Sequence, residues 1–180
     1  MNILDIPLIA RTRRNHALEH ATIHVLSEHE PRRPLMGRTT DRGFYLFGEV
    51  ETEEVATAVS EALDRLQGGE HSLAVHPRCG TNLATAGVLA GLSSFVAMQL
   101  SCRPTTGSGR SKSRLAKLPQ IVLAATVAVI AAQPLGLALQ KHVTTLPEVE
   151  EVTIGEITRL RRGQVVVHHV YLGQESAPHF

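Results

Sequence analysis

The sequence predicts an α+β protein in which a small mixed domain is interrupted by a two-helix membrane hairpin. Two long segments carry no Asp, Glu, Lys or Arg, and the sequence on both sides of them is polar and charged. The flanking sequence alternates between helix-like and strand-like patterns, and 180 residues suffice for one modest domain with an appendage. We therefore expect residues 1–82 and 141–180 to form the mixed domain together, and residues 83–140 to form the hairpin.

The amino-terminal residues 1–10 are apolar, but Asp5 and Pro7 interrupt them, and the first positive charges follow this stretch. A secretory signal places its positive charges first. We interpret residues 1–10 as an anchoring arm or a core strand. Residues 12–29 predict a helix, because their apolar side chains recur at helical spacing.

The next segment predicts a βαβ unit. Residues 31–43 indicate a loop, and Phe44–Val50 has the composition of a strand. Thr52 is placed to cap a helix that the glycines after residue 67 would end, and Ser72–Val75 predicts a second short strand. A right-handed crossover through the helix would make these two strands parallel.

The two uncharged segments, Leu83–Ser101 and Leu118–Leu139, predict membrane-spanning helices. Each has about the 20 residues that cross the hydrocarbon core of a bilayer, and both are rich in small residues that allow close helix packing. Gly87 and Gly91 form a G-x-x-x-G pair that indicates a helix contact. Pro134 is expected to kink or end the second helix. The lipid bilayer is thus the first partner that we expect.

The connection, residues 102–117, carries five positive charges and no acid. An excess of Lys and Arg in a short loop indicates its cytoplasmic side, which would place both halves of the mixed domain outside. The lack of an export signal argues the other way, so the orientation stays open. After the hairpin, residues 151–160 and 164–172 predict a β-hairpin that completes the mixed domain.

A histidine pair on the first predicted helix indicates a metal site. His16, Glu19 and His20 form an H-x-x-E-H pattern, and positions i and i+4 lie on one helix face. Two imidazoles with this spacing can share one ion, and zinc is the ion that we expect. Glu19 could take a proton from metal-bound water. The pattern resembles that of the inverzincin hydrolases.

A zinc ion needs a third ligand. His76 and Cys79 lie in a turn just before the first uncharged segment and are the preferred sources, and His24 lies one helical turn beyond His20. Inverzincins draw a third ligand from a downstream glutamate, a role that would here fall to Glu54 or Glu61.

Three segments, Arg14–Thr22, Arg42–Gly48 and His76–Asn82, resemble those of a family of small bacterial membrane proteins known as a domain of unknown function. The resemblance extends from about Arg11 to Leu172. It implies a multi-pass protein of the bacterial cell membrane and implies no activity.

Two functions remain open at this point. One is a zinc-dependent hydrolase, a peptidase that acts on membrane-proximal peptides. The other is a non-enzymatic assembly or scaffold subunit that binds a protein partner, with a structural metal or none. Nucleic-acid binding is not expected, because the net charge is +1 and aromatic residues make up 3% of the chain.

Overall fold

The computed structural model describes residues 3–100, 117–163 and 165–174. The chain divides into two compact units, one formed by Met1–His76 with Gln140–Phe180 and the other by Pro77–Leu139. The first unit combines helices with an antiparallel sheet, and the second is a pair of long apolar helices. The predicted α+β class with an inserted helical hairpin is therefore confirmed.

The sheet of the first unit has four strands in the order β1-β2-β4-β3, and every neighbouring pair is antiparallel. The second half of the chain thus supplies the strand that pairs with β2, and Phe44 lies opposite Val170. The strands are β1 (Met36–Thr40), β2 (Gly43–Phe47), β3 (Val152–Arg162) and β4 (Val165–Gln174).

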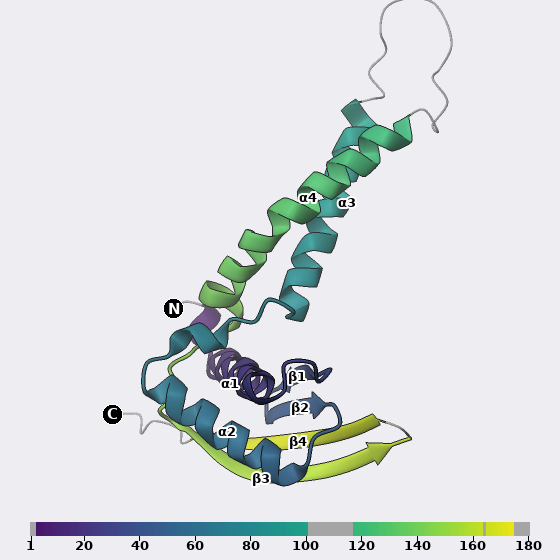
Figure 1. Ribbon diagram of the computed structural model, residues 1–180. Helices are drawn as coiled ribbons and strands as arrows, with labels where there is room; N and C mark the ends of the chain where they lie inside the picture. The colour runs from purple at the N-terminus through teal and green to yellow at the C-terminus, as the bar shows by residue number, and fades with distance from the viewer. Residues whose placement is uncertain (1–2, 101–116, 164, 175–180) are drawn as a thin grey trace, which may run out of the picture. The chain divides into compact units, whose positions relative to one another are not determined.

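Two helices, α1 (Pro7–His29) and α2 (Thr52–Gln67), pack against each other and against the sheet (Figure 1). Their apolar faces form one core with the inward side chains of the sheet, such as Phe44 and Val170. Three short helical turns complete the unit: η1 (Ile3–Asp5), η2 (His71–Ala74) and the π-helical turn η4 (Gln140–Thr144).

The predicted βαβ unit is wrong. Ser72–Val75 is not a strand, because residues 71–74 form the 3₁₀ turn η2. Leu73 and Ala74 are both buried, whereas consecutive side chains of a strand point to opposite faces. The loop expected at 31–43 contains β1, which β2 holds in place by antiparallel pairing.

The helix ends also differ from the prediction. Of the stretch 1–10, the described residues 3–10 do not form a core strand, because Pro7 opens α1 and Ile3–Asp5 form a 3₁₀ turn. Proline suits the first helical position, where its missing N–H would have no helical partner. Thr52 does not cap α2, because Glu51 occupies that position, and the Thr52 hydroxyl lies 3.2 Å from His168 Nε2.

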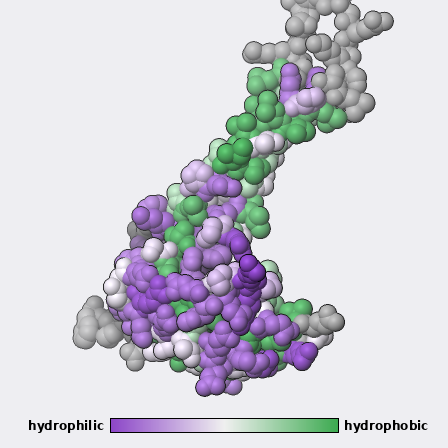
Figure 2. All heavy atoms as spheres, viewed as in Figure 1, coloured by the Kyte–Doolittle hydropathy of each residue, from purple (hydrophilic) through white to green (hydrophobic). Residues whose placement is uncertain are grey.

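The second unit consists of α3 (Gly80–Leu100) and α4 (Leu118–Leu139). Both helices are long and apolar enough to cross a membrane, and Figure 2 shows hydrophobic side chains gathered along them. Pro134 lies inside α4 and does not end it. Of the basic connection, residues 102–116 lie outside the described residues.

The packing of the two helices uses other residues than the predicted G-x-x-x-G pair. A Cβ at Gly87 or Gly91 would have no neighbour within 4 Å. A Cβ at Gly136 would instead overlap Asn82 of α3, whose Cα lies 3.1 Å from that position. The inward face of α4 carries a small residue at every fourth position: Ala124, Ala128, Ala132 and Gly136.

Candidate metal site

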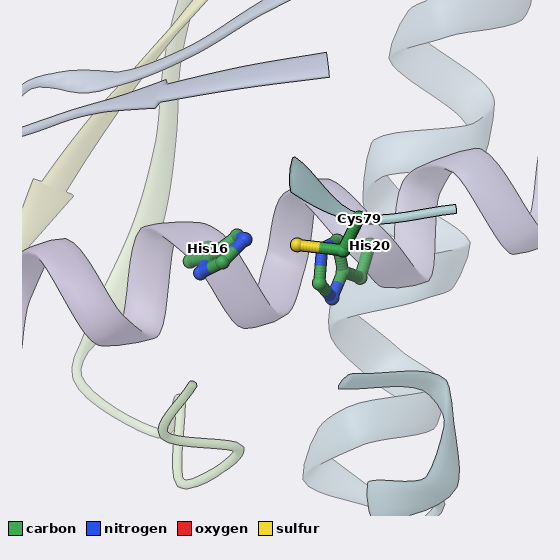
Figure 3. A group of neighbouring side chains, drawn as sticks. All are labelled: His16, His20 and Cys79. Carbon is green, nitrogen blue, oxygen red and sulfur yellow. The ribbon is translucent and has the colours of Figure 1, made fainter. Parts of the chain in front are cut away.

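The predicted histidine pair lies on one side of α1. Figure 3 shows His16 and His20 projecting from successive turns of this helix. Their ring centroids are 4.3 Å apart, and each ring can offer a nitrogen within 4.8 Å of a nitrogen of the other. Two nitrogens bound to one zinc ion lie about 3–4 Å apart, so this pair lies close to ligand distance.

Backbone carbonyls fix the orientation of both imidazoles. His16 Nδ1 lies 2.9 Å from the Thr144 carbonyl oxygen, and His20 Nδ1 lies 2.8 Å from the Ala74 carbonyl oxygen. A carbonyl oxygen accepts hydrogen bonds and cannot donate them, so Nδ1 carries the proton in both rings. The lone pair of each neutral ring is then on Nε2. This is the arrangement that orients histidines as metal ligands.

His24 and His76 lie beside this pair. The His76 ring centroid is 5.8 Å from that of His20 and 4.9 Å from that of His24. His24 Nε2 lies 3.0 Å from the Val75 carbonyl oxygen and therefore donates to it. The backbone N–H of His76 donates to the side-chain oxygen of buried Gln140. The structure thus places His76 next to the imidazoles of α1, and its role as a ligand stays a prediction.

Cys79 belongs to the second unit and directly precedes α3 (Figure 3). The backbone N–H of Thr81 donates to Cys79 Sγ over 3.4 Å. An N–H at the start of a helix favours negative charge on sulfur, and the thiolate is the form that binds metals.

Glu19 is buried between α1 and β1. Thr39 donates a hydrogen bond to its carboxylate, and a Cβ at Gly37 would overlap the same group. Burial raises the pKa of Glu19 above its usual value, while the hydrogen bond from Thr39 opposes this rise. A carboxyl with a raised pKa beside a histidine suits a general base, which was the predicted role.

The two glutamates expected from the inverzincin pattern are engaged elsewhere. Glu54 pairs with Arg33 at 2.6 Å, and Glu61 lies 3.4 Å from Arg65. Neither belongs to the group that could hold a metal among the described residues. The protein therefore shares with inverzincins the H-x-x-E-H spacing and not the downstream ligand.

The groups that orient the site carry no recognisable sequence signal. The carbonyl oxygens of Ala74 and Thr144 could come from any residue, so no motif identifies them. Thr39 and Gly37 lie on β1, a strand that lacks a β-rich alternating pattern. These contacts follow from tertiary structure alone.

Comparison with known proteins extends the sequence resemblance. Residues 11–157 match the model of a family described as "Domain of unknown function (DUF6391)". An uncharacterized protein of Picosynechococcus sp. (strain ATCC 27264 / PCC 7002 / PR-6) is 40% identical over 158 residues, which cover 78% of this chain and 72% of the relative. No solved structure matches. The chain belongs to the DUF6391 family, as its three resembling segments predicted.

Proposed function

We propose that this protein is a membrane-bound, zinc-dependent hydrolase. In this proposal His16, His20 and Cys79 bind the ion, and Glu19 acts as the general base. Two imidazoles and one thiolate are a donor set whose chemistry suits zinc, and a three-ligand zinc site leaves one position for water or substrate.

The observation that carries the proposal is the paired orientation of the imidazoles. Both His16 and His20 donate a hydrogen bond from Nδ1–H to a backbone carbonyl oxygen, which leaves the lone pair on Nε2. His20 is 2% exposed, so its ring has little freedom to turn. A polar side chain of an ordinary solvated helix face would not be held in this way.

Cys79 is the third ligand that chain connectivity favours. It follows His76 by three residues, so their Cα atoms are at most about 11 Å apart. His76 itself lies beside His20. The hydrogen bond from the Thr81 N–H adds support, because it stabilises the thiolate.

Glu19 supplies the acid–base chemistry of the proposal. It takes a proton from the attacking water, whose oxygen bonds to the carbonyl carbon of a peptide. It then returns that proton to the nitrogen of the leaving amine as the C–N bond breaks. Zinc, when bound, acidifies the water and polarises the carbonyl.

The membrane location is supported by the faces of α3. Most half-buried side chains of α3 are small or polar, while most of its large apolar side chains are exposed, which suits lipid as the surrounding solvent. A buried helix of a soluble protein would turn its large side chains inward. The exposed large apolar residues of α3 are Leu83, Val88, Leu92, Phe95, Val96, Met98 and Leu100.

Metal analysis of the full chain in detergent micelles tests the site. We expect about one zinc ion per chain, lost in His16→Ala, His20→Ala and Cys79→Ser and retained in Glu19→Gln. His29→Ala is the matched control, because His29 ends the same helix and belongs to no candidate donor group of the described chain. A wild-type protein without metal after growth and purification in zinc would overturn the proposal.

Hydrolysis is tested separately with a fluorogenic peptide library. Wild type and His29→Ala should cleave, and both His16→Ala and Glu19→Gln should lose about 100-fold or more of the rate, as expected for loss of a metal or a general base. Cleavage that survives in Glu19→Gln at full rate contradicts the role of this residue.

A structural zinc site is the second candidate, and the position of His76 favours it. A fourth protein ligand closes a zinc site to water, and the His76 ring is already 5.8 Å from that of His20. In that case His76→Ala should weaken zinc binding as strongly as His16→Ala does. In the hydrolase, His76→Ala leaves the zinc content unchanged.

A further inference from the structure

We infer that a pocket of the first unit binds the phosphate group of an anionic ester. The pocket has a volume of about 610 Å³. It is lined by Arg13 of α1, by residues of the 71–75 segment and by residues of the 141–148 segment. A single phosphate group would leave room in this volume for the organic part of an ester.

The charge of the lining favours an anion. Arg13 and Lys141 contribute two full positive charges, and the imidazoles of His71 and His142 add hydrogen-bond donors. Glu148 is the acidic residue among the lining side chains. Arg and Lys are the residues that most often recognise phosphate oxygens in proteins.

Arg13 is held in place for this role. One of its terminal nitrogens donates to the Thr145 carbonyl oxygen at 3.2 Å and to the His142 carbonyl oxygen at 3.4 Å. The guanidinium therefore ties α1 to the segment that carries Lys141 and His142. A charge fixed in advance costs less conformational entropy when a ligand binds.

The pocket shares its walls with the proposed metal site. Ala74 lines the pocket, and its carbonyl oxygen accepts the hydrogen bond from His20. Thr145 also lines it and directly follows Thr144, whose carbonyl orients His16. A ligand in the pocket would thus lie against the two segments that hold the imidazoles, so the pocket suits a substrate or regulator of that site.

Chain connectivity indicates where such a phosphate would come from. Lys141 and His142 follow the last residue of α4 by two and three positions. If α4 crosses a bilayer, as proposed above, these residues lie at the depth of the lipid headgroups, where cationic side chains meet lipid phosphates. The phosphate of a membrane lipid and that of a soluble ester share the chemistry that the pocket recognises.

The pocket is tested by titrating the full chain, in uncharged detergent, with inorganic phosphate and with glycerol phosphate. We expect saturable binding, and about tenfold weaker binding in the double variant Lys141→Gln/His142→Gln. Glu148→Gln removes the negative charge of the lining and should tighten binding. Lys117→Gln is the matched control, because Lys117 immediately precedes the other end of α4.

Nanodiscs separate the two sources. If the pocket binds lipid phosphate, the apparent Tm should rise in nanodiscs that contain phosphatidic acid relative to nanodiscs of phosphatidylcholine alone. The double variant Lys141→Gln/His142→Gln should abolish this rise. Binding of glycerol phosphate with no lipid effect identifies a soluble ester instead. Absence of both effects in the wild type, or equal binding in the double variant, overturns the inference.

The phosphate pocket is tested independently of the proposed zinc chemistry, so failure of one can be told from failure of the other. The pocket side chains are not zinc ligands, so His16→Ala should lose zinc and still bind glycerol phosphate. A metal-free protein that binds the ester would refute the hydrolase and leave the pocket standing. A protein that binds zinc and cleaves peptide but does not bind phosphate would refute the pocket and leave the hydrolase standing.

Discussion

Gly37 determines how closely β1 approaches the Glu19 carboxylate. A Cβ at this position would overlap the carboxylate and lie within 2.7 Å of Glu19 Cγ. The glycine is therefore needed for space, because its backbone is not in the left-handed region. Thr39, two residues further along β1, donates the hydrogen bond to the same carboxylate. The strand β1 therefore fixes the position of the Glu19 carboxylate.

Gly37→Ala should destabilise the protein by about 1–3 kcal/mol, the usual cost of overpacking a tight site. The loss should be much smaller in a Glu19→Ala background, because the overlapping side chain is then absent. Chemical unfolding of the four proteins of this double-mutant cycle, in micelles, measures the coupling. An equal loss of unfolding free energy in both backgrounds would show that Gly37 is not needed to make room for the Glu19 side chain.

At the scale of elements, long periodic segments were predictable and short irregular ones were not. The apolar periodicity of α1 and α2 is local, and both helices form over the periodic stretches, although α1 begins earlier, at Pro7. β1 has the sequence Met-Gly-Arg-Thr-Thr, which becomes a strand through its pairing with β2. Ser72–Val75 has strand-like composition, but the burial of two consecutive residues in η2 overrides it.

Arg65 joins α1 to the end of α2. Its guanidinium contacts Glu28 of α1 at 2.8 Å and Glu70 at 2.7 Å. These hydrogen bonds lower the pKa values of Glu28 and Glu70 below the usual value. A carboxylate whose folded-state pKa is lowered stabilises the fold above its unfolded pKa and loses that contribution as the pH falls through the folded pKa.

Arg65→Gln should therefore lower the apparent Tm at pH 7, and the difference from wild type should shrink as the pH falls below about 4.5. The effect is modest because the three side chains are partly exposed. Circular dichroism melts from pH 7 to pH 3 measure it. A Tm difference that stays constant over this range would contradict the ionic origin.

The hairpin offers a contrast between two glycines. Gly136 faces Asn82, and Gly87 has open space around its Cβ position. Gly136→Leu should separate α3 from α4, because small residues allow the close approach of membrane helices, and should lower the apparent Tm by several degrees. Gly87→Leu is the control and should behave like wild type in size-exclusion chromatography and melting. Greater damage from Gly87→Leu would restore the G-x-x-x-G interpretation.

At the scale of the whole molecule, the first unit needs both ends of the chain. β4 pairs with β2 across more than 110 intervening residues, since Gly43 lies opposite Tyr171 and Phe47 opposite Val167. The sequence predicted this assembly from the position of the uncharged segments. It predicted the histidine pair of the candidate site because helical spacing is local, but not the carbonyls of Ala74 and Thr144, which long-range folding brings to α1.

This assembly makes a prediction about membrane topology. A single sheet cannot form across a bilayer, because its strands pair by direct hydrogen bonds. Residues before α3 and after α4 must then lie on one side, and the connection between the helices on the other. Cysteines that replace Ser60 and Glu156, both exposed in the first unit, should react alike with a membrane-impermeant maleimide on intact cells.

A cysteine that replaces Lys117, next to the start of α4, should show the opposite accessibility. The parent for all three variants lacks Cys79 and Cys102, so that each probe is the sole thiol. Permeabilised cells serve as the control, because every site should then react. A helical hairpin returns the chain to the side of the membrane from which it entered. If α3 and α4 both cross, the cysteine at position 117 should therefore react in intact cells only where those at positions 60 and 156 do not, or the reverse. Equal labelling of all three sites in intact cells would show that α3 and α4 do not span the bilayer.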